Sequence, residues 1–161
     1  MRILGPNGAQ DLVIPVHAPN RTPMKDVLID FSSRWQQRHW GAIRTAYGQS
    51  PFFLHYKDAF EQFYLAEKWE TLVSLNTAIL DLMLKLLKTE KTYSLSISFL
   101  PYNDNDVRLK MSPGKTAVVT FPPYIQNFSE RHGFVPDLSI LDLLYSIGPE
   151  SKNYLLKVNN P

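Results

Sequence analysis

Basic and aromatic side chains crowd residues 34–53 of the chain, which read RWQQRHWGAIRTAYGQSPFF. Guanidinium groups such as those of Arg34, Arg38 and Arg44 bind phosphate and carboxylate oxygens. Arg34 and Arg38 stand one helical turn apart, a spacing at which like charges repel unless an anion or an acid lies between them. His39 belongs to the residue type that exchanges protons most readily near neutral pH. The stretch could therefore bind an anion and move a proton, or its aromatic residues could belong to the core.

A second polar pair, Asp106 and Arg108, stands in the segment DVRLK. In an extended chain these two side chains would point the same way and could hold a polar ligand. Asp106 is then a second candidate for proton transfer. The other interpretation is a surface ion pair worth under about 1 kcal/mol. The residues around the pair are rich in turn formers and predict a long loop, an element that is often functional.

Familiar cofactor and metal motifs are missing from the sequence. No P-loop, GxGxxG, GxSxG or HExxH occurs, and we expect no cofactor. The chain has no cysteine, which excludes disulfides, thiol nucleophiles and cysteine metal sites. Its four histidines show no ligand spacing, so we expect no metal. The net charge of +2 gives no reason to expect a nucleic-acid partner.

Apolar runs in the chain are too short to cross a bilayer, which takes about 20 residues. The richest of them, TAILDLMLKLLK, is interrupted by Asp81 and Lys85. The N-terminus lacks the apolar region of a signal peptide. We therefore expect a cytoplasmic protein that does not span a membrane.

Helical periodicity explains most of the aromatic residues in the stretch 34–53. Ser33 is a good helix cap, and Gln36 three residues later would complete a capping box. At 3.6 residues per turn, Trp35, His39 and the alanines 42 and 46 form one stripe. The arginines lie largely outside that stripe. The pattern favours a helix whose aromatic face is core and whose histidine stands at the edge.

Alternation and turn signals predict the remaining elements. We expect short strands at 2–4 and 11–16 around a Gly-Pro-Asn-Gly turn, another at 26–31, and a central one at 93–99. One further helix should begin at Ser50-Pro51, and a second, long helix should span residues 67–88. A short helix should end at Gly133. A helix capped by Asp137 should end at Gly148, and the last should begin at Pro149. The chain is expected to form a single α+β domain, residues 1–161, with about five helices and a helix-rich C-terminal half.

The order of these segments resembles the WbqC-like protein family. The resemblance rests on the runs WQQRHWGAIRTAYGQSPFFLHY and KWETLVSLN, a loop containing DVR, and PYIQNF, with PDLSILDLLYSIGPES as its most specific part. It covers nearly the whole chain. The family is associated with O-antigen and related surface-polysaccharide gene clusters. The resemblance thus implies a role in making or modifying a glycan precursor, a nucleotide-activated or lipid-linked amino sugar.

Members of this family typically begin with a further segment of several tens of residues. MRILGPNG resembles the tail of the last strand in that segment, so we expect the N-terminal part of the family domain to be missing here. The predicted N-terminal hairpin supports the same expectation, because its first strand, residues 2–4, is shorter than its second, residues 11–16.

Two functions stay open from the sequence. The first is a transferase that modifies an activated sugar precursor or another anionic small molecule, with His39 or Asp106 moving the proton. Its substrate-binding residues would be Arg34, Arg38, Arg44 and Arg108, together with Tyr47 and Tyr124, which match the family's motifs. The alternative is a non-catalytic module that docks on a protein partner, an enzyme of glycan assembly, through an exposed face of ILDLLYSI. RNA binding is disfavoured because the aromatic residues of the helix within 34–53 lie on the face that is expected to pack into the core.

Overall fold

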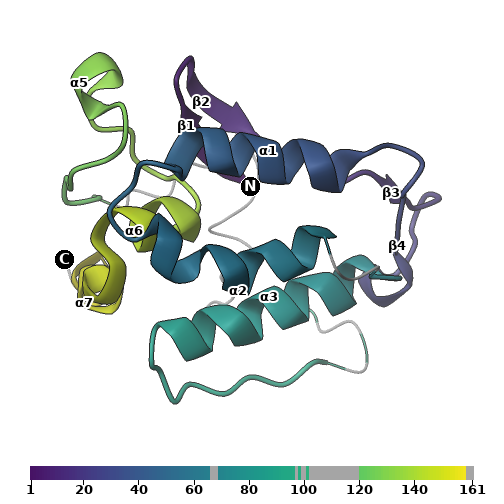
Figure 1. Ribbon diagram of the computed structural model, residues 1–161. Helices are drawn as coiled ribbons and strands as arrows, with labels where there is room; N and C mark the ends of the chain where they lie inside the picture. The colour runs from purple at the N-terminus through teal and green to yellow at the C-terminus, as the bar shows by residue number, and fades with distance from the viewer. Residues whose placement is uncertain (66–68, 97, 99–100, 102–119, 159–161) are drawn as a thin grey trace.

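The computed structural model describes residues 1–65, 69–96, 98, 101 and 120–158. Three helices, α1 (Trp35–Tyr47), α2 (Phe53–Leu65) and α3 (Leu72–Leu86), form the body of the fold. In Figure 1, α2 lies between the other two and packs on both of them. Shorter elements close the two ends of this body.

The aromatic stripe of α1 faces the core, as its periodicity predicts. Trp35, Trp40 and Tyr47 are all buried. Trp40 stacks on Tyr64 with ring centroids 5.7 Å apart, and its indole N–H donates a 3.0 Å hydrogen bond to Glu61. The rings of Trp35, Trp40 and Tyr47 are structural, because each is almost completely buried.

The start of α1 differs from the prediction. The helix begins at Trp35 with Arg34 at the cap position, and no side chain caps it. Arg34 adopts φ −79° and ψ 48°, which places Ser33 one residue too far upstream to cap the first turn. The Ser33 hydroxyl is instead buried without a hydrogen-bond partner among the described residues, and the Gln36 amide reaches the Phe63 carbonyl at 3.5 Å. The predicted capping box was therefore wrong.

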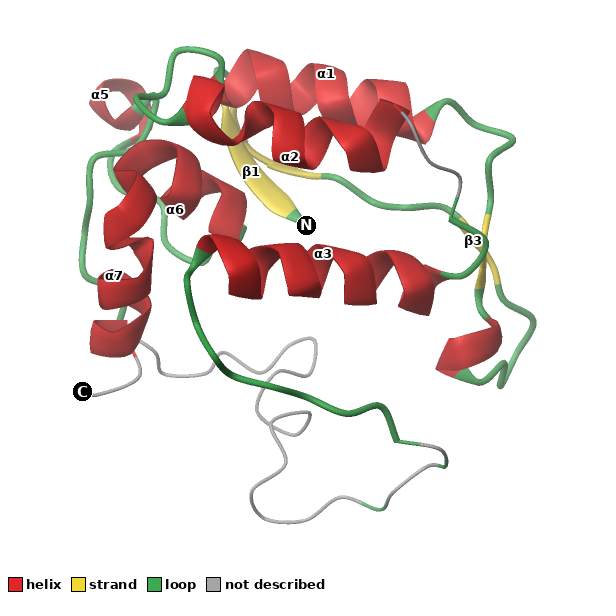
Figure 2. Ribbon diagram, turned by 60° about the horizontal axis from the view of Figure 1, so that its bottom comes forward, coloured by secondary structure: helices red, strands yellow, loops and turns green. Residues whose placement is uncertain are grey.

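Within the described residues, four short strands form two antiparallel pairs. β1 (Arg2–Gly5) pairs with β2 (Gly8–Asp11), and β3 (Val16–His17) pairs with β4 (Leu28–Ile29). The second arm of the hairpin begins earlier than predicted, because a turn of only two residues reverses the chain and Gly8 at φ 106° permits it. Beyond β2 the chain runs between the α1–α2 pair and α3. The N-terminus also lies between these helices (Figure 2).

The pair β3–β4 is tied to the start of α3. Leu72 N–H donates to the Val27 carbonyl at 2.9 Å, and Ile29 N–H donates to the Glu70 carbonyl at 3.0 Å. Thr71 caps α3 by accepting a 3.1 Å hydrogen bond from Ser74 N–H. The 3-10 helix η1 (Met24–Asp26) precedes β4. The predicted strand over 26–31 is thus real but short.

The predicted central strand is not formed in its described part. Residues 91–96 have no strand assignment, and residues 97 and 99 lie outside the described residues. Tyr93 and Leu95 are exposed, and Tyr93 donates its hydroxyl to Asp81 at 2.7 Å. Alternation of polar and apolar residues alone does not make a strand, because β-propensity depends on packing against neighbouring strands.

Helices make up the C-terminal part, as expected. They are α5 (Ser129–His132), α6 (Ile140–Ile147), the 3-10 helix η2 (Gly148–Glu150) and α7 (Ser151–Val158). Gly133 ends α5 as predicted, but Ser139 caps α6 in place of Asp137. Asp137 has φ 57°, a left-handed conformation that belongs to the loop before the helix. The α+β class is confirmed, with helices in the majority.

Candidate functional site: an apolar cleft beside His39

His39 is held on α1 in one defined orientation. Its side chain is 6% exposed, and its ring meets Trp35 edge to face at 5.1 Å between centroids. The ring nitrogen Nε2 lies 3.1 Å from the carbonyl oxygen of Val13. A carbonyl can only accept, so Nε2 carries the proton and the neutral ring keeps its lone pair on Nδ1. Nδ1 has no hydrogen-bond partner among the residues that the structure describes.

Burial lowers the pKa of His39 below its ordinary value of 6.5. The hydrogen bond to Val13 acts in the opposite direction because it favours the protonated ring, while the charges of the N-terminal ammonium group and of Arg38 lower the pKa further. The imidazole is therefore neutral at pH 7. A neutral imidazole with a free Nδ1 is the form of histidine that can accept a proton.

A cleft of about 450 Å³ opens beside this ring. Its size falls within the range of about 300–1,000 Å³ that is usual for small-molecule sites. Its walls come from residues 12–14, from α1, α2 and α3, and from the start of α6. They are mostly apolar and consist of Met1, Leu12, Val13, Ile14, Phe60, Phe63, Tyr64, Leu72, Ile79, Met83, Ile140 and Leu141, with His39, Asn76 and Ser139 as the polar members.

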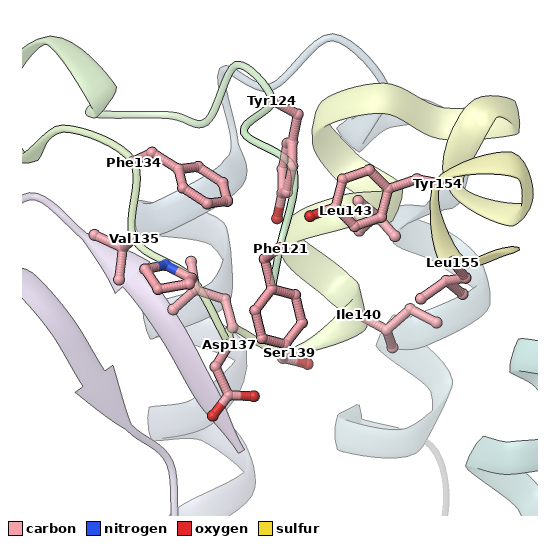
Figure 3. A pocket seen from close by; sticks show the side chains of 12 residues that line it. Phe121, Tyr124, Phe134, Val135, Asp137, Ser139, Ile140, Leu143, Tyr154 and Leu155 are labelled. Atoms are coloured by element: carbon pink, nitrogen blue, oxygen red, sulfur yellow. The ribbon is translucent and has the colours of Figure 1, made fainter. Parts of the chain in front are cut away.

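A smaller hollow of about 140 Å³ lies at the C-terminal end of the fold. Figure 3 shows the rings of Phe121, Tyr124, Phe134 and Tyr154 around it. Tyr124 stands edge to face with Phe134 at 5.5 Å and with Tyr154 at 5.1 Å between centroids. We call this hollow the aromatic pocket. Ser139 and Ile140 line both the aromatic pocket and the cleft, so the first residues of α6 separate the two.

A buried carboxylate, Asp142, lies behind the aromatic pocket. Its side chain is 0% exposed, and its Oδ2 accepts hydrogen bonds from the Tyr124 hydroxyl at 2.6 Å and from the Gln126 amide at 3.0 Å. Burial raises the pKa of Asp142, and its interactions with Tyr124, Gln126 and Tyr47 oppose that rise. The proton-transfer candidates from the sequence did not include this residue. The signal that could have found it is a single acid within the apolar run ILDLLYSI.

Gln126 joins this carboxylate to the loop that forms the pocket wall. Its amide donates to the Val135 carbonyl and its oxygen accepts from the Val135 N–H, both at 2.9 Å. The loop between them includes Phe128, a non-glycine residue at φ 63°. Asp142, Gln126 and Val135 thus fix the shape of the loop that carries Tyr124 and Phe134.

Tyr47, expected to bind substrate, lies in the core and lines neither the cleft nor the aromatic pocket. Its side chain is 0% exposed, and its hydroxyl accepts a 3.4 Å hydrogen bond from Leu4 N–H. Burial raises the pKa of Tyr47, and the charge of Asp142 raises it further. Tyr124, by contrast, lines the aromatic pocket.

The three arginines of α1 point to solvent. Arg34, Arg38 and Arg44 are exposed and line neither hollow, and none forms an ion pair with another described residue. Asp106 and Arg108 lie outside the described residues. Of the predicted site residues, the structure thus places His39 in the cleft and Tyr124 in the aromatic pocket.

The described residues contain no group of three or more His, Asp or Glu side chains that could hold a metal ion. Within the same residues, no helix combines the length and apolar character that a membrane crossing requires.

Comparison with known proteins identifies the family. An uncharacterised protein of Mycobacterium tuberculosis, Rv1507c, is 26% identical over 183 residues, which cover 96% of this chain and 79% of the relative. No solved structure matches. The model of the WbqC-like protein family matches residues 1–120, about three quarters of the sequence, and the chain therefore belongs to the WbqC-like protein family.

Proposed function

We propose that the chain is a cytoplasmic transferase of surface-polysaccharide biosynthesis, of the O-antigen type, that modifies an activated sugar precursor. Membership of the WbqC-like family supports the pathway. The observation that carries the chemistry is His39, a histidine with its Nε2 proton fixed by Val13 and its ring in the wall of a cleft of ligand size.

His39 acts as the general base in this proposal. Its Nδ1 takes the proton from a hydroxyl or amine of the acceptor while that atom forms a bond to the transferred group. The bond to the leaving group breaks, and the proton passes from His39 to the departing atom. The Val13 carbonyl stabilises the imidazolium that exists between these two events, as its opposing effect on the pKa of His39 indicates.

The anionic part of the precursor would meet the arginines of α1. Arg38 directly precedes His39 in the sequence, and its charge acts on the histidine ring. The walls of the cleft are mostly apolar, so the phosphates of a nucleotide sugar would stay outside it. Arg34, Arg44 and Arg108 remain candidates for the same role, and Asp106 remains the second candidate for proton transfer.

Binding of nucleotide sugars tests the proposal. A panel of uridine, thymidine and guanosine diphosphate sugars should contain one that raises the melting temperature of the protein. Arg38→Ala should reduce that shift, and His39→Gln should keep the shift but abolish product formation detected by mass spectrometry. His55→Gln, which changes an exposed histidine on α2, serves as the control. A panel without any shift, together with a silent Arg38→Ala, would refute the proposal.

The alternative function is a non-catalytic docking module. The surface that the sequence suggested for docking, the apolar side chains of α6, is largely buried. Leu141 and Leu144 of α6 are buried at 3% and 0% exposure, and Ile147 is half-buried. The helix ILDLLYSI faces the core, and a protein partner would have to use another face.

A further inference from the structure

The walls of the cleft select an apolar occupant. Apart from His39, Asn76 and Ser139, its lining side chains are aliphatic, aromatic or thioether groups. A sugar or a phosphate placed there would lose its hydrogen bonds to water and find few replacements. An alkyl chain would bury apolar surface on all sides, which is the interaction that stabilises such a complex.

The position of His39 indicates which chemical group of the ligand carries the alkyl chain. The histidine lines the same cleft as the apolar side chains of α2 and α3, so a group carried on an alkyl chain comes within its reach. An acyl group joins an alkyl chain directly to an electrophilic carbonyl carbon. A base that deprotonates an attacking amine or hydroxyl is what transfer of an acyl group needs.

The aromatic pocket provides a place for the acceptor. It adjoins the cleft across Ser139 and Ile140, and its rings offer flat apolar surfaces to the C–H face of a sugar. Ser139 is fixed at this boundary, since its N–H donates to the Arg2 carbonyl at 2.8 Å and its hydroxyl caps α6. An acyl donor in the cleft and a sugar in the aromatic pocket would meet at the start of α6.

We infer that the transferred group is a medium-length acyl chain supplied as a thioester, an inference that rests on the proposed function and specifies its donor. The sugar's amine or hydroxyl attacks the thioester carbonyl carbon, and a new C–N or C–O bond forms. The C–S bond breaks with its electron pair on sulfur. The proton passes from the acceptor to Nδ1 of His39 and then to the thiolate, so the products are an acylated sugar and a free thiol.

Binding of thioesters of different chain length tests the inference. The probes are the acetyl, hexanoyl and decanoyl thioesters of N-acetylcysteamine, which carry no nucleotide. The wild-type protein should bind the decanoyl thioester about tenfold or more tightly than the acetyl thioester, because each methylene removed from water adds to the affinity. Equal affinity for the three thioesters, or no binding of any, would overturn the inference without any variant.

Two neighbouring residues of α3 supply matched variants. Ile79→Trp fills the cleft and should remove the preference for the long chain, whereas Leu80→Trp changes an exposed residue outside the cleft and should leave it intact. Retention of the preference in a folded Ile79→Trp protein would place the chain elsewhere and overturn the inference.

Separate measurements of sugar binding and thioester binding distinguish this inference from the proposed function. Phe134→Leu, in the aromatic pocket, should weaken the melting-temperature shift from the nucleotide sugar and leave thioester binding unchanged. If nucleotide sugars stabilise the protein and thioesters do not bind, the acyl donor is wrong and the proposed transferase stands. If thioesters bind with the expected chain dependence and no sugar precursor stabilises the protein, the donor site stands and the sugar acceptor is wrong.

Discussion

The hydroxyl of Tyr124 donates a 2.6 Å hydrogen bond to Oδ2 of Asp142, a carboxylate with no exposed surface. The bond joins the loop of residues 121–128 to the first turn of α6. It also holds the Tyr124 ring between Phe134 and Tyr154 in the wall of the aromatic pocket. Burial raises the pKa of Tyr124, and the charge of Asp142 raises it further, so the hydroxyl stays protonated and remains a donor.

Tyr124→Phe should lower the free energy of unfolding by about 1.5–3 kcal/mol, the usual cost of removing a hydrogen bond to a charged group. Urea denaturation measures it. The matched control is Tyr93→Phe, which removes a tyrosine–aspartate hydrogen bond of 2.7 Å on the surface. Water replaces the lost partner there, and we expect little change in stability. Equal effects of the two substitutions would contradict the structural role of the Tyr124–Asp142 pair.

Asp142 should make stability fall as the pH rises above the ordinary carboxyl value. Its pKa is raised from 3.8, mainly by burial, so just above that pH the folded state still holds a proton that the unfolded state has lost. Unfolding free energies measured at successive pH values should show this contribution, and Asp142→Asn should remove it. Tyr124→Phe should widen the pH window, because a donor that favours the ionised carboxylate is lost. Asp58→Asn, at an exposed site, should leave the profile unchanged.

His39 should contribute a pH dependence of the opposite sign. Its pKa is lowered from 6.5 by burial. As the pH falls through 6.5, the unfolded chain binds a proton that the folded protein does not, and stability decreases. Above this range the contribution is constant. His39→Gln should flatten the profile between the two pKa values, and His55→Gln should not. Indistinguishable profiles for the wild type and His39→Gln would contradict the burial and the fixed tautomer of this ring.

Local sequence patterns predicted those features of the fold that depend on neighbours along the chain. The stripe of Trp35, His39 and Ala46 faces inward because a period of 3.6 places these residues on one side of a helix. Ser33 failed as a cap although its residue type and spacing fit, because the backbone at Arg34 sets where the first helical turn begins. Of the strand predicted at 93–99, residues 93–96 are described and have no strand assignment, since pairing requires a second strand, about which alternation says nothing.

The candidate site could be anticipated only in part for the same reason. Residue type pointed to His39, but its partner Val13 is 26 residues away in the sequence. Asp142 meets Gln126 across 16 residues, and the cleft collects walls from both ends of the described chain. Contacts of this kind arise from tertiary packing, which a single sequence does not encode in any local pattern.

Gly148 is the position at the end of α6 where a side chain should be least tolerated. Its φ is 54°, and a Cβ atom would lie 2.5 Å from the Phe52 ring. Gly133 at φ 68° and ψ −166° has no atom within 4 Å of the same position, so Gly133→Ala costs backbone strain alone, about 1–3 kcal/mol. Gly148→Ala should cost clearly more in urea denaturation, since a clash is added to the strain. Combining it with Phe52→Ala should reduce the extra cost to that of strain, as a double-mutant cycle would show. If the two glycine substitutions are equally destabilising, Phe52 does not pack against the turn between α6 and η2 as the structure shows.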